Sequence, residues 1–173
     1  TAPPAQPGES PARLRRIPTM RVLRPADAAE AAECWELALA HRTGPTSLVC
    51  SRQDLPAVRR GGGGENLCAR GAYVLAEAEG ERRVTLIGTG SEVALALPAQ
   101  EALAAEGVPV RVVSMPCTDV FDRQEREWRT GVLPAGLPRV AVEAGLTDYW
   151  RKYVGLEGEV VGIHTFGESA PAG

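Results

Sequence analysis

Apolar and polar positions divide the first third of the chain into a strand, a helix and a second strand. The apolar stretch 20–23 predicts a strand, and the alanine-rich stretch 26–42 predicts a helix with Asp27 as its N-cap. One helix face collects apolar residues at helical spacing: Ala31, Trp35, Ala38 and Leu39. A further strand is expected at 46–50. This β-α-β order is typical of a parallel sheet, although it is too short to close a domain.

The remaining two thirds of the chain continue the alternation of strands and helices. Strands are expected at 72–76, 84–87, 110–114, 139–142 and 159–161, and helices at 91–106, 123–128 and 148–154. This spacing predicts an α/β fold, a three-layer domain with a mostly parallel sheet. The β-α-β piece before it would then be part of a second α/β domain.

Four consecutive glycines separate these two parts. The run RRGGGGE at 59–65 carries no packing pattern, which is typical of a flexible linker. It lacks the Lys and Ser or Thr that would follow in a P-loop, so a phosphate cradle has less support. We therefore divide the chain into 1–56, a linker at 57–66, and 67–173.

Composition limits the function classes. The chain has 173 residues, 44% of them hydrophobic, and a net charge of −3 without a dense basic patch, so nucleic-acid binding has no support. Its four cysteines form no CxxC pair, which argues against a zinc site or a disulfide framework and favours reduced thiols in the cytoplasm. No leader and no apolar run of membrane-spanning length are seen, and both ends look cut.

The strongest chemical candidate is Arg52 in the stretch TSLVCSRQDLP at 46–56. A buried strand that ends here would place a bidentate cation where open α/β sheets bind their ligands, as a phosphate site requires. A strand-end arginine that pairs with a carboxylate would have the same sequence.

Two further stretches have both a chemical and a structural interpretation. The segment 88–92, GTGSE, follows an apolar strand and opens a helix; it could hold an anion, or form a tight turn with Ser91 as the helix cap. Glu143 and Asp148 lie at a strand end and a helix start, as acid–base or metal-binding carboxylates do. A solvated Glu143 and a capping Asp148 would explain them equally well.

The histidines and aromatic residues favour structural roles. His41 and His164 have no second ligand nearby in sequence and are expected at a helix end or in a hydrogen bond. Tyr149, Trp150 and Tyr153, with Arg151 and Lys152 between them, could form a base-stacking surface. On a helix, however, Trp150 and Tyr153 share one face, which favours packing or a subunit contact.

Ordered blocks along nearly the whole chain resemble bacterial-type transketolases. They are IPTMRVLRPAD, SRQ, ARGAYVLAE, LIGTGSEVALA, VRVVSMPCTDVFDRQ, VLPAGLPRVAVEAG, TDYWRKYVGLEG and FGESAPA. Related pyruvate-dehydrogenase-type subunits and deoxyxylulose-phosphate synthase share the architecture, but the combination of RPAD, SRQ and FGESAPA resembles transketolase itself. The segment 1–56 resembles the tail of the middle, pyrimidine-binding domain, and 67–173 resembles a C-terminal domain truncated at its end.

The resemblance implies a transferase of two-carbon ketol units between sugar phosphates in the pentose phosphate pathway and the Calvin cycle. Such enzymes are homodimers that bind thiamine diphosphate and a divalent metal (Mg or Ca), through regions that this chain does not match. It also implies that Arg52 contacts the phosphate of substrates such as xylulose 5-phosphate and ribose 5-phosphate. We expect no catalytic, cofactor-binding or metal-binding residue in this chain.

Four departures from the family pattern affect this expectation. The family's substrate-binding aspartate and histidine align with Thr1 and Ala5, which supply neither their charge nor their proton chemistry. Pro11 and Pro98 fall where helices are expected, and each predicts a kink or a break. The resemblance therefore predicts a transketolase C-terminal part that is inactive alone and contributes a phosphate contact and subunit packing. The alternative is a non-catalytic α/β assembly or regulatory module derived from a transketolase.

Overall fold

The structure is a computed structural model that describes residues 10–59 and 64–164. Its first part is built from α1 (Ser10–Leu14), β1 (Arg21–Leu23), α2 (Ala28–Ala40) and β2 (Thr46–Leu48). β1 and β2 pair in parallel, with Val22 opposite Ser47, so the predicted β-α-β unit is confirmed. The Asp27 side chain accepts a hydrogen bond from the backbone N–H of Glu30 and caps α2 as expected.

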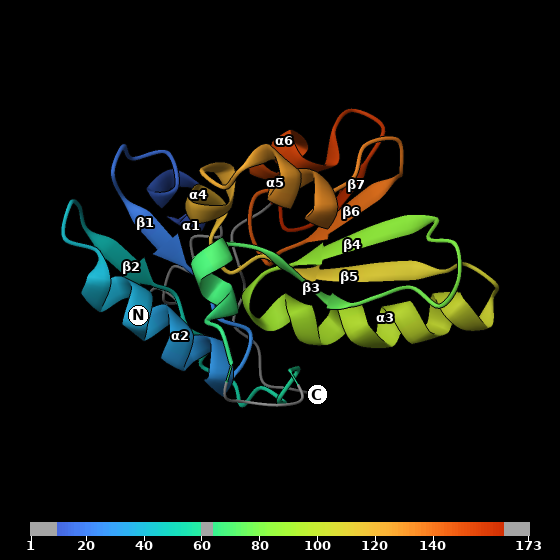
Figure 1. The fold of residues 1–173 in the computed structure, drawn as a ribbon, viewed down its shortest axis with the longest axis horizontal. Helices are drawn as coiled ribbons and strands as arrows, with labels where there is room; N and C mark the ends of the chain where they lie inside the picture. Colours follow the sequence, from blue (N-terminus) through green and yellow to red (C-terminus); the bar gives the residue numbers. More distant parts are fainter. Residues whose placement is uncertain (1–9, 60–63, 165–173) are drawn as a thin grey trace, which may run out of the picture.

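The second part is a five-stranded sheet in the order β3-β5-β4-β6-β7, and Figure 1 shows it beside the β1–β2 piece. Its strands are β3 (Tyr73–Ala76), β4 (Val84–Gly88), β5 (Val110–Ser114), β6 (Arg139–Val142) and β7 (Glu159–Val161). Only the edge strand β3 is antiparallel to its neighbour, and the other pairs are parallel. The predicted α/β class with a mostly parallel sheet is therefore confirmed.

Helical segments cover both faces of this sheet. They are η1 (Leu67–Arg70), η2 (Gly90–Glu92), α3 (Val93–Ala105), α4 (Thr118–Asp122), α5 (Arg126–Val132), η3 (Asp148–Trp150) and α6 (Arg151–Val154). Leu86 and Val112 pack with α3 on one face, whereas Ile87 and Val113 pack with residues of α4, α5 and α6 on the other. Figure 1 shows α3 on the opposite side of the sheet from α5 and α6. This alternation along β4 and β5 is what period-2 strands between two helical layers require.

Three expectations about elements differ from the structure. The helix expected at 123–128 is replaced by α4 and α5, because Thr118, Val120 and Phe121 are buried and tertiary packing overrides their modest helix propensity. The short helix η1 was not expected. Strand β2 ends at Leu48 and is only half-buried, so the strand before Arg52 is neither as long nor as buried as predicted.

The prolines do not break their helices within the described residues. Helix α3 runs from Val93 to Ala105 through Pro98, which lies on its exposed side, where water can satisfy the carbonyl that loses its donor. Helix α1 continues from Pro11 to Leu14, and the residues before Ser10 lie outside the described part of the chain. The predicted break at Pro98 is wrong, whereas a kink there and the expectation for Pro11 stay predictions.

Candidate functional site

Arg52, the predicted phosphate contact, is exposed in a bend that follows β2. The bend is held by the backbone N–H of Gln53, which donates to the Ser51 hydroxyl over 3.0 Å. The Arg52 side chain forms no hydrogen bond or ion pair with another described residue. Its guanidinium is therefore available to a ligand, and the alternative of a carboxylate partner finds no support in residues 10–59 and 64–164.

Arg24, which follows β1, has the opposite environment. It is buried, and its two terminal nitrogens donate to Glu143 Oε1 over 2.6 Å and to Glu92 Oε2 over 3.2 Å. Glu143 follows β6, and Glu92 ends the short helix η2 behind β4. The carboxyl ends of parallel strands from both sheets thus meet in one buried ionic network.

Glu143 is the centre of this network. Arg15 binds both of its carboxylate oxygens at 2.8 Å, and the Trp150 indole N–H donates over 2.6 Å. Burial alone would raise the pKa of Glu143, but the hydrogen bonds and charges of Arg15 and Arg24 lower it below its ordinary value. Glu143 is therefore a fixed anion and not a proton carrier.

The proposed carboxylate pair is not formed. Glu143 is 2% exposed, so the solvated Glu143 of the structural interpretation is also wrong. Asp148 is exposed, opens η3 and is not its cap, because Thr147 occupies the cap position without a side-chain bond. Neither interpretation of this pair is supported.

The turn at 88–92 packs against a cation of the chain itself, the guanidinium of Arg24. Gly90 has φ of +58°, and a Cβ atom there would lie 3.1 Å from Nε of Arg24. Both the positive φ and this close approach favour glycine at the position. The tight strand-to-helix turn is confirmed. Ser91 is not the cap, however, since it lies inside η2 and donates to Glu92 Oε1 over 2.6 Å.

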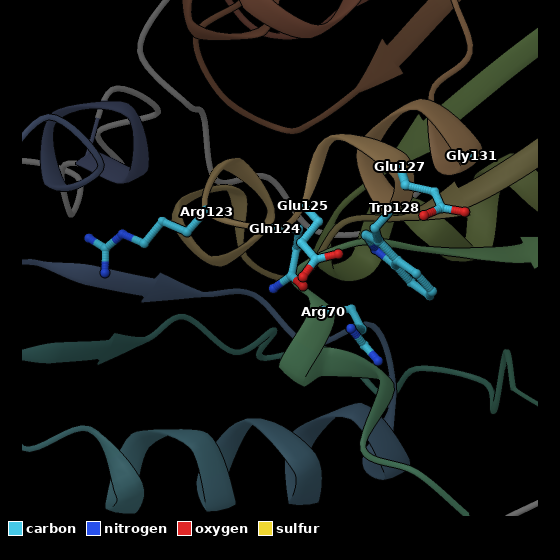
Figure 2. A pocket seen from close by; sticks show the side chains of 7 residues that line it. All are labelled: Arg70, Arg123, Gln124, Glu125, Glu127, Trp128 and Gly131. Atoms are coloured by element: carbon cyan, nitrogen blue, oxygen red, sulfur yellow. The ribbon is translucent and has the colours of Figure 1, made fainter.

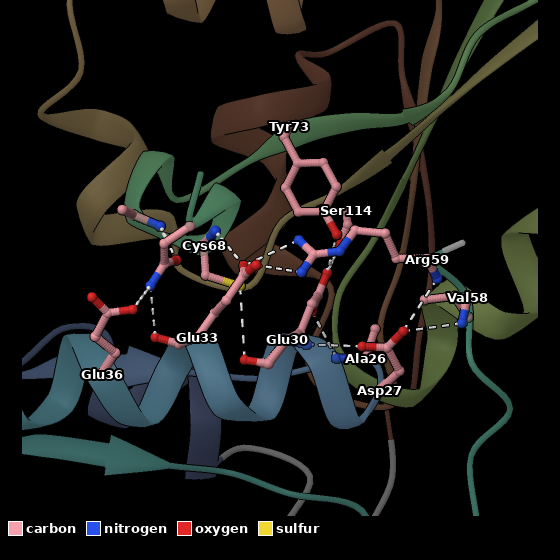
Figure 3. A network of polar contacts seen from close by, with 12 residues as sticks. Ala26, Asp27, Glu30, Glu33, Glu36, Val58, Arg59, Cys68, Tyr73 and Ser114 are labelled. Atoms are coloured by element: carbon pink, nitrogen blue, oxygen red, sulfur yellow. Dashed lines mark hydrogen bonds and ion pairs between the residues drawn. The ribbon is translucent and has the colours of Figure 1, made fainter. Parts of the chain in front are cut away.

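A second polar network joins α2 to the sheet domain (Figure 3). Asp27, Glu30 and Glu33 follow one another at one-turn spacing and accept hydrogen bonds from residues after position 57. Asp27 Oδ2 accepts from the backbone N–H groups of Val58 and Arg59, both over 3.1 Å. Glu33 pairs with the Arg59 guanidinium and accepts from the Cys68 N–H. Two residues near the start of the predicted linker, Val58 and Arg59, are therefore anchored to α2.

Glu30 is fully buried within this network. The Tyr73 hydroxyl donates to its Oε1 over 2.7 Å, the Ser114 hydroxyl does so over 2.5 Å, and the Ala26 N–H donates to Oε2 over 2.7 Å. Burial raises the pKa of Glu30, and the three hydrogen bonds only partly oppose this. Glu30 accepts hydrogen bonds from neutral groups and pairs with no cation among the described residues, whereas Glu143 pairs with two arginines.

Comparison with known proteins assigns these two parts. The family described as "Transketolase, pyrimidine binding domain" matches residues 1–58, and the "Transketolase-like TK C-terminal domain" matches 71–173. Transketolase 1 of Escherichia coli K12 is 51% identical over 98% of this chain. This chain belongs to the transketolase family.

Solved transketolases share its fold. The Pichia stipitis enzyme in complex with sedoheptulose 7-phosphate is 33% identical over 92% of this chain and 23% of its own, with a TM-score of 0.83. A split-gene transketolase described as an inactive β4 tetramer is 28% identical over 91% of this chain and 52% of its own, with a TM-score of 0.72. Our chain spans about a quarter of the curated Escherichia coli relative, 26% of its length.

His41 and the aromatic residues singled out by the sequence have structural roles. His41 ends α2, and its Nδ1 lies 3.1 Å from the Thr46 hydroxyl, as expected. Trp150 and Tyr153 are buried in the core while Arg151 and Lys152 are exposed, which confirms packing over base stacking. His164 is exposed at the end of the described region. Thr1 and Ala5 lie outside the described residues.

A hollow of about 580 Å³ lies between η1, α5 and the α4–α5 connection (Figure 2). Arg70 and Arg123 line it together with Glu125 and Glu127, so its charges balance. The Arg70 guanidinium lies 4.9 Å from the centre of the Trp128 ring and is already partnered. We assign no ligand to this hollow.

Sequence analysis missed the residues that hold the two parts together. Arg24 stands out in the sequence only as part of the RPAD block, and no motif singles out Arg15. Their partner Glu143 lies more than 115 residues away along the chain. A conspicuous signal was nevertheless present, because an arginine and a glutamate each follow directly after an apolar strand.

Proposed function

We propose that this chain is the C-terminal part of a transketolase, and that Arg52 contacts the phosphate of its sugar substrate. The observation that carries this is the contrast at the ends of β1 and β2: Arg24 is neutralised, whereas Arg52 is exposed and unpaired among the described residues. An exposed guanidinium on a fixed bend suits bidentate phosphate binding. The sugar-phosphate complex of the Pichia stipitis relative supports the substrate class.

The proposal assigns ketol transfer to a larger assembly, with this chain inactive alone. Thiamine diphosphate and a divalent metal (Mg or Ca) belong to the family's chemistry. Within the described ranges, no group of three His, Cys, Asp or Glu side chains could hold a metal ion, so these residues do not fit that metal. We therefore place the cofactor in parts of a transketolase that this chain does not match.

Subunit packing is the second contribution that we propose, within the homodimer typical of the family. Trp35 and Leu39 lie one turn apart on α2 and are 57% and 66% exposed. Such adjacent large apolar side chains favour contact with the remainder of the enzyme. No helix in the described ranges has the length and apolarity needed to cross a membrane.

A specific observation supports the alternative of a non-catalytic assembly or regulatory module. Thr1 and Ala5 replace the aspartate and the histidine of the family's substrate loop. A T1D/A5H variant separates the two functions. It should raise ketol transfer if the chain supports catalysis, and it should change nothing if the chain serves assembly alone.

The deciding experiment measures ketol transfer from xylulose 5-phosphate to ribose 5-phosphate. The chain is tested alone and with an added N-terminal transketolase part that supplies the cofactor domain, in the presence of thiamine diphosphate and magnesium. We expect no transfer by the chain alone and transfer by the mixture. Absence of transfer in the mixture, with the T1D/A5H variant equally silent, would overturn the catalytic proposal.

A further inference from the structure

A second hollow, of about 330 Å³, opens on the α5 and α6 side of the sheet. Its volume is in the range of small-molecule sites. Phe121 and Tyr153, both nearly buried, contribute an aromatic floor. Arg52 is not among the lining residues, and the hollow is therefore separate from the proposed substrate contact.

The lining of this hollow is strongly cationic. It holds Arg126, Arg129, Arg139 and Lys152 against a single carboxylate, Asp122. The chain as a whole has a net charge of −3, so this excess is local. The hollow beside Trp128, with two arginines and two glutamates, shows that neighbouring surface of the same domain is electrically balanced.

The one carboxylate is already engaged. Lys152 Nζ lies 2.6 Å from Asp122 Oδ2, and the Tyr153 hydroxyl donates to the same oxygen over 3.0 Å. Arg126 and Arg129 are exposed on α5, and their guanidinium groups form no hydrogen bond or ion pair with other described residues. Two bidentate donors at the rim are thus unused.

Arg139 is the third arginine of this hollow that has no carboxylate partner among the described residues. Its terminal nitrogens donate to the backbone carbonyls of Tyr153, Leu133 and Pro134 over 2.7, 3.1 and 2.8 Å. Burial lowers the pKa of Arg139. In Arg15, burial has the same tendency, but Glu143 raises the pKa above its ordinary value. Arg139 has no such compensating charge.

We propose that this hollow binds a phosphate group, either inorganic phosphate or the phosphate of a small phosphorylated molecule. A phosphate offers several acceptor oxygens and up to two negative charges, which suits the unused guanidinium donors of Arg126 and Arg129 beside the uncompensated charge of Arg139. The aromatic floor would accommodate the carbon skeleton of an ester. The site does not depend on Arg52 or on ketol transfer, so it can be tested independently of the proposed function.

Calorimetric titration of the whole chain with sodium phosphate tests the proposal. The titration is carried out on the R52A variant, which removes the other proposed phosphate contact, at constant ionic strength set with sodium chloride. We expect saturable binding at one site. Adding R126A/R129A should weaken it roughly tenfold or more, because two charge-assisted contacts are lost.

The matched control is R42A/R83A, which removes two exposed arginines outside the hollow that are equally without described side-chain partners. It changes the net charge by the same amount and should leave the affinity unchanged. Circular dichroism verifies that both double variants are folded. No saturation, or equal weakening in the two double variants, would overturn the site.

Ribose 5-phosphate, used in a parallel titration, distinguishes the two sources of the phosphate. Tighter binding than inorganic phosphate supports a phosphorylated small molecule, and equal or weaker binding supports the free ion. In both cases the R126A/R129A loss must appear. Binding of ribose without phosphate at the same affinity would contradict the proposal.

Discussion

Arg24 and Arg52 follow neighbouring parallel strands, yet they have different roles. Arg24 is buried and held by Glu143 and Glu92, both from the other part of the chain. Arg52 is exposed and has no partner among the described residues. The comparison teaches that position at the carboxyl end of a strand does not by itself make an arginine a ligand contact. What distinguishes the two is whether carboxylates of the fold already use the guanidinium.

The largest expected effect is on stability, in the R24A variant. Removing Arg24 takes one of two cationic partners from buried Glu143 and takes the Arg24 ion pair from Glu92. Breaking a buried ion pair by removing one partner costs about 3–5 kcal/mol. The free energy of unfolding, measured in urea, should fall by that amount. R52A should change it by less than about 0.5 kcal/mol, because exposed sites without partners contribute little. Equal destabilisation by R24A and R52A would contradict the different roles assigned to the two arginines.

Acidification should protonate Glu143 and so remove the charge that pairs with Arg24. The pKa of Glu143 in the fold is below its ordinary value of 4.5, so its stabilising effect is present above about pH 4.5 and is lost as pH falls through the lower, folded value. Unfolding free energy measured between neutral pH and pH 3 should therefore decline in the native chain. The E143Q variant should start lower and decline less. A slope that E143Q leaves unchanged would contradict this role.

Glu30 should give the opposite pH dependence of stability. Its pKa is raised by burial, so the stabilisation that comes with its protonated form is fully present below pH 4.5 and is lost as pH rises through the folded value. An E30D variant, which withdraws the carboxylate from Tyr73 and Ser114, should be destabilised at every pH. E30Q should instead flatten the decline above pH 4.5. The same urea series measures both variants.

Among the residues of the Arg24 network, the smallest loss of stability is expected for Glu92, the more distant partner of Arg24. E92Q keeps the side-chain shape and removes one charge at 3.2 Å, while Glu143 still holds Arg24 at 2.6 Å. The loss should be about 1 kcal/mol, the size of one hydrogen bond. A loss as large as that of R24A would show that Glu92, and not Glu143, is the main partner.

Local patterns predicted much of the fold and little of the joint between its parts. The strands at 110–114, 139–142 and 159–161 agree with the structure residue for residue, because apolar runs bounded by turns identify strands well. The buried face of α2 was harder. Its apolar residues Trp35 and Leu39 are exposed, whereas Glu30 is buried against Tyr73 and Ser114.

The reason is that the partners are distant in sequence. Tyr73 and Ser114 lie 43 and 84 residues from Glu30, and no local periodicity indicates that a helix glutamate will meet two hydroxyl groups there. The candidate Arg52 was found from its block of sequence. Its exposure and its lack of a described partner became visible only in three dimensions.

The most direct test of the role of Arg52 measures KM for ribose 5-phosphate in the chain combined with an N-terminal transketolase part. R52A should raise KM roughly 10- to 100-fold, as the loss of a charge-assisted hydrogen bond implies, without changing the unfolding free energy. An acceptor aldose without phosphate should show no such difference between the native chain and R52A. An unchanged KM for ribose 5-phosphate in R52A would contradict the claim that Arg52 is the arginine left for the substrate.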